Sequence, residues 1–171
     1  MNDRISPDVW DPLSRALHWL SAVFILGMLI DGYWMNHFVA REGKLTQFHW
    51  HAMFGIYFAL LVAIRIVSRL RTTSPAPPAG VSKAQHLASS VVHGLMYLLM
   101  VAIPIAGWIT WSARARRLPV HLFGLFEVPW AVATPDRVLE HRSEDLHIYM
   151  AYVLLALIVL HVAAALHHHF V

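Results

Sequence analysis

The chain has 171 residues, of which 58% are hydrophobic and 13% are charged, whereas a soluble domain has roughly 25% charged residues. This composition nearly excludes a soluble globular protein. The absence of cysteine excludes disulfides, thiolate zinc sites, iron–sulfur clusters and covalently attached c-type haem. The formal net charge is only +3 and no basic run occurs, so we expect no nucleic-acid binding. Ligand chemistry must therefore come mainly from the 13 histidines.

Four apolar stretches are each near or above the roughly 20 residues that a helix needs to cross a ~30 Å hydrocarbon core. They cover about residues 16–35, 48–67, 87–111 and 146–166. The first is longer than a signal-peptide core, and no small-residue cleavage site follows it. We therefore expect one all-α domain over residues 1–171, an integral membrane four-helix bundle with up-down topology.

The connections between these spans differ in character. A short polar turn at 41–44 requires the first two helices to be antiparallel neighbours, and the proline-rich residues 72–80 cannot be helical. The apolar, aromatic segment 120–130 is too short to cross, so we expect it at the headgroup boundary. The basic residues divide almost evenly between the two sides, and charge alone therefore does not orient the bundle.

Histidines occur at two depths of the expected bundle. His18 begins the first span and His161 lies late in the fourth, so both belong to one leaflet, whereas His51 and His147 belong to the other. His147 and His161 are 14 residues apart, which places them within about 40° of one helix face and about 21 Å apart along the axis. Such facing imidazoles suit two b-type haems stacked across the membrane.

Two neighbouring histidines leave an alternative open in the second span. The side chains of His49 and His51 diverge by about 200° around a helix, so only one of them can face the bundle interior. Their spacing does not choose between them.

Further polar residues lie near the depth of His18. Arg15 is a candidate partner for a haem propionate, and Arg65 is expected to extend its charged end toward the membrane surface. His93 is a candidate ligand or, together with His168, a contact for a bound quinone.

Several motifs spread over nearly the whole chain carry a family resemblance. They are S-R-A-L-H-W at 14–19, His51 with Gly55, the run from Tyr97 to Pro104 and Gly107, and His147 with His161 followed by A-A-A-L and His168-His169. Together they resemble the bacterial cytochrome b561 family. The resemblance implies two b haems, ligated by His18 with His161 and by His51 with His147, and it selects His51 over His49. It also implies cytoplasmic termini and a location in the bacterial inner membrane.

The same resemblance implies electron transfer between a reduced donor and ubiquinone. One branch of the family is similar to superoxide oxidases, which take electrons from superoxide at the periplasmic surface. Three basic residues follow the third span on that side and are candidates for steering an anion, although an ordinary solvated loop is the alternative: Arg114, Arg116 and Arg117.

Other functions are compatible with the same pattern. A cytochrome b subunit that carries electrons between a partner dehydrogenase and quinone has the same architecture. A transporter that uses the histidines for a transition metal or for protons belongs to another class, and a purely structural membrane protein is the third alternative. The sequence leaves the oligomeric state and any protein partner open.

Overall fold

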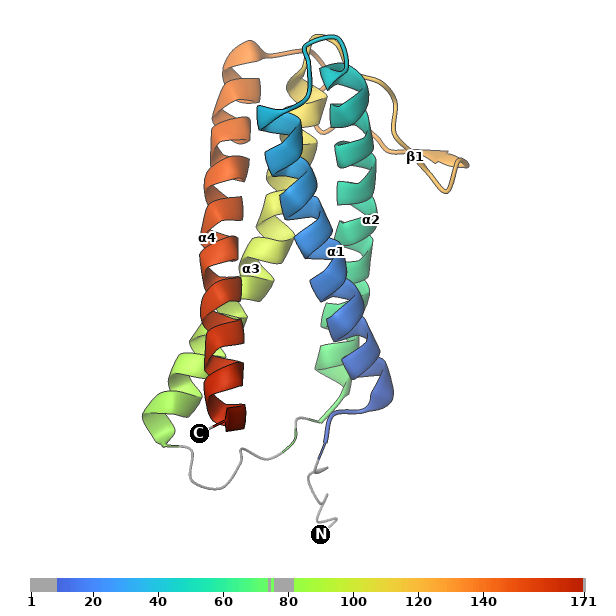
Figure 1. Cartoon of the computed structure of the whole chain (residues 1–171). Helices are drawn as coiled ribbons and strands as arrows, with labels where there is room; N and C mark the ends of the chain where they lie inside the picture. The colour runs from blue at the N-terminus through green and yellow to red at the C-terminus, as the bar shows by residue number, and fades with distance from the viewer. Residues whose placement is uncertain (1–8, 74, 76–81, 171) are drawn as a thin grey trace.

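The computed structural model describes residues 9–73, 75 and 82–170. It is a bundle of four long helices, and the beginning of the first helix and the end of the last lie at the same end of the bundle (Figure 1). This arrangement confirms the expected all-α, up-down fold. The helices are α1 (Pro12–His37), α2 (Lys44–Arg71), α3 (Lys83–Ala113) and α4 (Arg137–Phe170).

Polar side chains cap the N-termini of α1, α3 and α4, where backbone N–H groups have no partner within the helix. Asp11 precedes α1 and accepts a hydrogen bond from the backbone N–H of Ser14 at 3.0 Å. The side chain and the backbone N–H of Ser14 together lower the pKa of that carboxyl group. Ser82 and Gln85 form a reciprocal capping box at the start of α3. Asp136 accepts from two backbone N–H groups at the start of α4. Each cap explains why a helix begins where it does.

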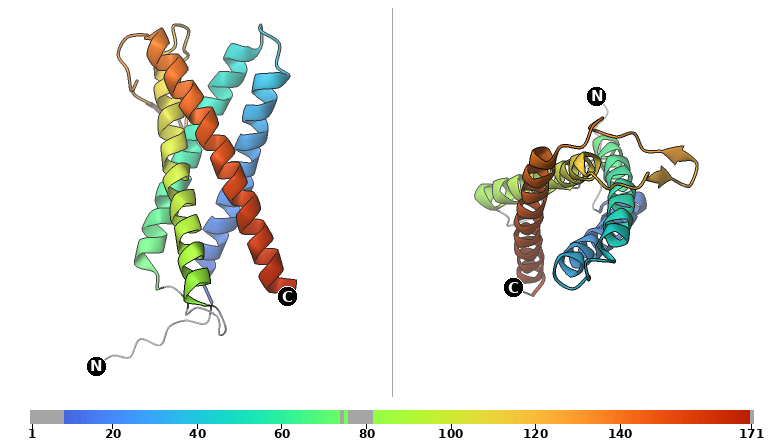
Figure 2. Two further views of the ribbon diagram at one scale, coloured as in Figure 1. Left: turned by 90° about the vertical axis from the view of Figure 1, so that its left-hand side faces the viewer. Right: turned by 90° about the horizontal axis from the view of Figure 1, so that it is seen from above.

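Each helix packs against its neighbour in sequence, α1 on α2, α2 on α3 and α3 on α4. The two views of Figure 2 show that α4 crosses the bundle obliquely. A buried apolar layer joins all four helices near their middles, and its most buried members are Phe58, Val62 and Leu154. Such close packing stabilises helix association in lipid, where the hydrophobic effect between helices is absent.

The outer surface of the bundle is apolar. All four helices are long and apolar enough to cross a membrane. Large side chains such as Trp19, Ile30 and Leu70 are 68%, 69% and 82% exposed. Lipid is the natural solvent for such a surface, because a soluble protein rarely leaves so large an apolar area uncovered. The chain is therefore a multi-pass membrane protein.

The connection between α3 and α4 holds a small antiparallel hairpin of β1 (His121–Leu122) and β2 (Phe126–Glu127), which projects beside α2 (Figure 1). Phe123 and Gly124 make the turn with φ of 54° and 70°, a conformation that is unfavourable for a bulky residue. The hydroxyl of Tyr57 on α2 accepts a hydrogen bond from the Phe123 backbone N–H at 2.9 Å. The segment is thus no fifth span, and its position at the headgroup boundary stays a prediction.

Candidate functional site

Two pairs of histidine rings face each other inside the bundle, one pair toward each end. His51 of α2 and His147 of α4 form the upper pair, named for the end of Figure 1 at which these helices begin, and their ring centroids are 6.1 Å apart. His18 of α1 and His161 of α4 form the lower pair, with centroids 6.3 Å apart. The structure therefore brings together the residues of both expected pairs.

These separations suit two imidazoles that share one metal ion. A metal–imidazole bond of about 2.0–2.1 Å, with about 1 Å more from nitrogen to ring centre, puts the two centroids about 6 Å apart. His93 of α3 lies closer to His161, with centroids 5.1 Å apart, which leaves too little room for an ion between the rings. The spacing favours His18 over His93 as the partner of His161.

Both rings of the upper pair are oriented by hydrogen bonds from Nδ1. His147 donates to the backbone carbonyl of Ile103 at 2.9 Å, and His51 donates to Oδ2 of Asp31 at 2.8 Å. The other carboxylate oxygen of Asp31 accepts from Gln47 at 2.6 Å. With the hydrogen on Nδ1, each neutral ring keeps a free lone pair on Nε2, the form in which histidine binds a metal.

Glycines make room for these two rings. A Cβ atom at Gly107 of α3 would lie 3.0 Å from Cε1 and Nδ1 of His147, and one at Gly32 of α1 would lie 3.4 Å from Cε1 of His51. A side chain at Gly107 would therefore push against the histidine ring. Because Gly107 has no side chain, His147 of α4 can approach the backbone carbonyl of Ile103, which also lies on α3.

A cavity of about 470 Å³ adjoins the upper pair. His51, His147, Gly55 and Gly107 line it, and most of its remaining wall is apolar and aromatic. Its volume lies within the range of roughly 300–1,000 Å³ that is typical of ligand and cofactor pockets. The upper pair thus combines two free imidazole nitrogens with an apolar space for a large ligand.

The lower pair has a charged neighbour that the sequence prediction placed wrongly. Arg65 of α2 does not extend to the membrane surface. It donates to Oγ of Ser21 at 2.7 Å and to Nδ1 of His18 at 2.9 Å, and it covers the ring of Tyr97 at 5.1 Å. Hydrogen-bond acceptors inside the bundle compete successfully with water at the helix end.

The Arg65 contact sets the tautomer of His18. Because arginine only donates, Nδ1 of His18 accepts, and the ring hydrogen therefore lies on Nε2. Ligation of a metal by Nε2 requires Arg65 to release Nδ1. Its bond to Ser21 and its contact with Tyr97 keep Arg65 beside the site when that bond is broken.

The other candidates near the lower pair are more loosely placed. His93 is exposed, and its Nδ1 donates to the backbone carbonyl of Ser89 at 2.7 Å. Arg15 is exposed on α1, one turn before His18. The side chain of His168 lies outside the described residues. The structure therefore places His93 beside the lower pair and Arg15 one helical turn from it on α1.

His49 lies against aromatic neighbours. Its ring centroid lies 6.0 Å from that of Trp111 and 6.1 Å from that of Trp50. Its Nδ1 is buried without a hydrogen-bond partner among the described residues. His51, and not His49, is the α2 histidine that meets α4.

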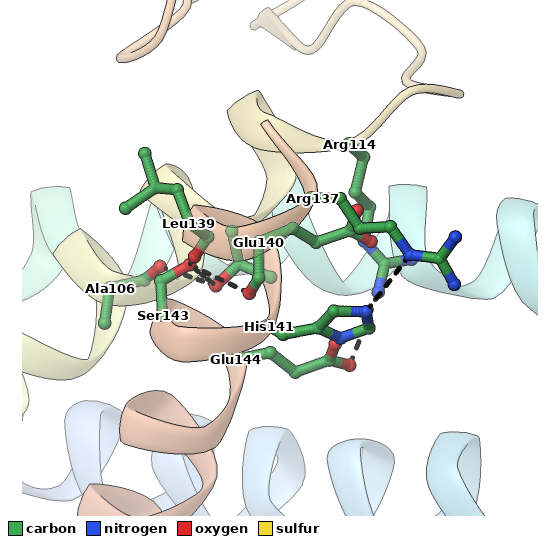
Figure 3. A network of polar contacts seen from close by, with 9 residues as sticks. Ala106, Arg114, Arg137, Leu139, Glu140, His141, Ser143 and Glu144 are labelled. Atoms are coloured by element: carbon green, nitrogen blue, oxygen red, sulfur yellow. Dashed lines mark hydrogen bonds and ion pairs between the residues drawn. The ribbon is translucent and has the colours of Figure 1, made fainter. Parts of the chain in front are cut away.

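The three arginines after α3 have different surroundings, which Figure 3 shows in part. Arg114 lies 3.3 Å from carboxylate oxygens of both Glu140 and Glu144. Arg117 donates to the backbone carbonyls of Ser112, Val132 and Ala133. Arg116 is exposed. Arg114 and Arg117 therefore hold the loop together, and Arg116 is the member of the cluster that faces solvent.

The described residues offer no denser metal site. Within 9–73, 75 and 82–170, no group of three or more His, Asp or Glu side chains converges as metal ligands. Paired imidazoles beside an apolar cavity are residues that could hold the iron of a b-type haem.

A family model of prokaryotic cytochrome b561 matches residues 9–171. The chain belongs to the prokaryotic cytochrome b561 family. It is thus a membrane cytochrome b that transfers electrons, and b-type haem is its implied cofactor. The match confirms the resemblance that the sequence motifs indicated.

Two curated relatives come from Escherichia coli strain K12. Cytochrome b561 homolog 2 is 31% identical over 169 residues, which cover 97% of this chain and 87% of that protein. Cytochrome b561 homolog 1 is 24% identical over 163 residues, which cover 91% and 86%. The similarity to cytochromes b561 therefore extends along all four helices.

The upper pair fits the b haem of a cytochrome b561. The two Nε2 lone pairs suit iron, and the apolar cavity suits a porphyrin. The lower pair fits by its ring spacing once Arg65 has released His18.

Sequence reasoning gave no role at these sites to Asp31, Gln47 or Gly107, and it placed Arg65 elsewhere. Asp31, Gln47, Arg65 and Gly107 contact a ligand candidate or its partner. The one available signal was the presence of ionisable residues, Asp31 and Arg65, inside apolar spans, since such residues usually serve a function there.

Proposed function

We propose that this cytochrome b561 carries two b haems, one held by His51 and His147 and the other by His18 and His161. It passes electrons between a donor at the loop end of the bundle and ubiquinone in the membrane. The observation that carries this proposal is the presence of two imidazole pairs on either side of one apolar layer. The ring centroids are 6.1 Å apart within the upper pair and 6.3 Å apart within the lower pair. A haem supplies one-electron chemistry when it is bound.

The residues of the chain orient the ligands and exclude water. The Ile103 carbonyl and Asp31 hold the upper rings, whereas Phe58 and Leu154 pack between the two levels. Such an apolar filling supports electron tunnelling while it blocks entry of water. By resemblance, both termini are cytoplasmic, the loop end is periplasmic, and the membrane is the bacterial inner membrane.

Superoxide is the donor that we propose. Two superoxide ions give up two electrons to form two O₂, and ubiquinone takes up two electrons and two protons to form ubiquinol. The exposed Arg116 offers a positive group at the loop end, and a positive surface raises the encounter rate of a small anion. A cytochrome subunit that receives electrons from a partner dehydrogenase would need no such surface.

Superoxide is expected to reduce the haems rapidly, and the rate should fall as ionic strength rises because salt screens the attraction. Arg116→Gln should slow the reaction severalfold without loss of haem. Stopped-flow absorbance with a superoxide source measures both effects. Arg69→Gln, which removes an exposed cation at the opposite end, is the matched control and should have no effect. A slow reaction that is insensitive to salt would contradict superoxide as the donor and leave electron transfer in place.

The quinone site is proposed near the lower pair, with His93 and His168 as the polar contacts of the quinone. His93 is exposed and lies beside His161, and quinone needs polar groups next to an apolar surface. The double variant His93→Ala, His168→Ala should therefore lower quinone reduction by about tenfold, the loss expected from one to two hydrogen bonds. Quinone reduction is followed with haem content measured in parallel. An unchanged rate, with both haems retained, would place the quinone elsewhere.

A further inference from the structure

The two histidine pairs have neighbours of opposite charge. In the upper pair, His51 donates to the carboxylate of Asp31 at 2.8 Å. In the lower pair, His18 contacts the guanidinium group of Arg65 at 2.9 Å. Asp31 touches the imidazole itself, whereas Arg65, which must release Nδ1 when Nε2 of His18 binds iron, stays beside the ring through its contacts with Ser21 and Tyr97.

Both charged groups are held in place within membrane-spanning helices. Gln47 donates to Asp31 at 2.6 Å, and Arg65 is bound to Ser21 at 2.7 Å and covers Tyr97. Electrostatic interactions are stronger in such a low-dielectric region than in water. Fixed charges there are rare and usually functional.

A fixed charge beside an axial ligand changes the midpoint potential of the haem. The oxidised haem carries one more positive charge than the reduced haem. A carboxylate that accepts from the ligand makes the imidazole more basic and favours the oxidised form, which lowers the potential. A cation favours the reduced form and raises the potential.

Other charged groups near the upper pair act in the same direction as Asp31. Arg114 and Glu144 line the cavity, and Arg114 is paired with both Glu140 and Glu144. This group of one cation and two carboxylates does not cancel the negative charge of Asp31.

We propose that Asp31 and Arg65 set the order of the two midpoint potentials. The haem held by His51 and His147 has the more negative potential, and the haem held by His18 and His161 has the more positive one. This inference rests on the proposed presence of two haems. Each electron then moves from the haem of more negative potential, at the upper pair, to the haem of more positive potential, at the lower pair. The first haem is oxidised by one electron and the second is reduced by one. Asp31 and Arg65 are positioning residues that impose this direction on the bundle.

The test is a potentiometric titration of haem absorbance in the purified, haem-loaded protein. Asp31→Asn should raise the midpoint potential of the haem held by His51 and His147. Arg65→Gln should lower the midpoint potential of the haem held by His18 and His161. Each variant should change the equilibrium constant for electron sharing between the haems about tenfold, which corresponds to about 59 mV for one electron. Proteins with His147→Ala or His161→Ala, each expected to keep one haem, identify which midpoint belongs to which pair.

Charge-conserving variants are the matched controls. Asp31→Glu and Arg65→Lys should shift the midpoints much less than the neutral variants. Asp145→Asn and Arg69→Gln, which alter exposed charges, should leave them unmoved.

Shifts of the opposite sign, or unmoved midpoints with both haems bound, would overturn the inference. Fewer than two haems in the unaltered protein would instead contradict the proposed function. Should one neutral variant lose its haem, the other decides, because the two act on different haems.

Discussion

Replacing His147 with alanine is expected to remove the haem of the upper pair and to leave that of the lower pair in place. His147 is the only α4 residue described in ring contact with His51, so iron at this level would keep a single imidazole. Haem content by the pyridine haemochrome assay should fall from about two to about one per chain. The difference spectrum of the remaining haem should stay that of a low-spin haem with two imidazole ligands.

His141→Ala is the matched control for this variant. His141 lies on the same helix, is exposed and contacts Arg137 at 3.5 Å. Its loss should leave both haems bound. Unchanged haem content in His147→Ala would refute the assignment of the upper pair. Loss of both haems with unchanged helix content would show that the two levels do not bind independently.

The second expected result concerns the two adjacent histidines of α2. His51→Ala should remove the haem of the upper pair, whereas His49→Ala should retain both haems. The reason is that His51 meets His147 and is oriented by Asp31, while His49 packs against Trp111. Haem stoichiometry and the absorbance spectrum of each variant measure the difference.

These two variants serve as controls for each other, because they remove the same side chain from positions two residues apart. Helix content by circular dichroism shows whether either change disturbs the bundle. The reverse result, with haem lost from His49→Ala and kept in His51→Ala, would exchange the two roles.

The helices and the two histidine levels follow from local patterns in the sequence. Apolar runs of about 20 residues predict spans whatever their tertiary contacts. Once the helices alternate in direction, the depth of His18 or His147 depends only on its place in its own span. The facing of His147 and His161 follows from their 14-residue separation. The observed bundle confirms the fold, whereas the ligand assignments stay predictions.

The partners of the histidines depend on contacts between helices, which sequence spacing does not reveal. Arg65 was expected at the membrane surface, but Ser21 and His18, 44 and 47 residues away, provide acceptors inside the bundle. Asp31 reaches His51 from another helix for the same reason. Gly107 could be noted as a small residue in a span, but its fit against His147 depends on how closely α3 approaches α4.

The buried layer of Phe58, Val62 and Leu154 has a consequence for membrane voltage. A proton needs a continuous chain of hydrogen-bonding groups to move, whereas an electron can tunnel through packed hydrocarbon, so this layer passes one and stops the other. Electron movement between the two proposed haems is then a net displacement of charge. A complete crossing of the membrane by one elementary charge corresponds to about 2.3 kcal/mol per 100 mV. In the proposed orientation electrons move toward the negatively charged cytoplasmic side. A large membrane potential therefore slows electron transfer through this cytochrome b561.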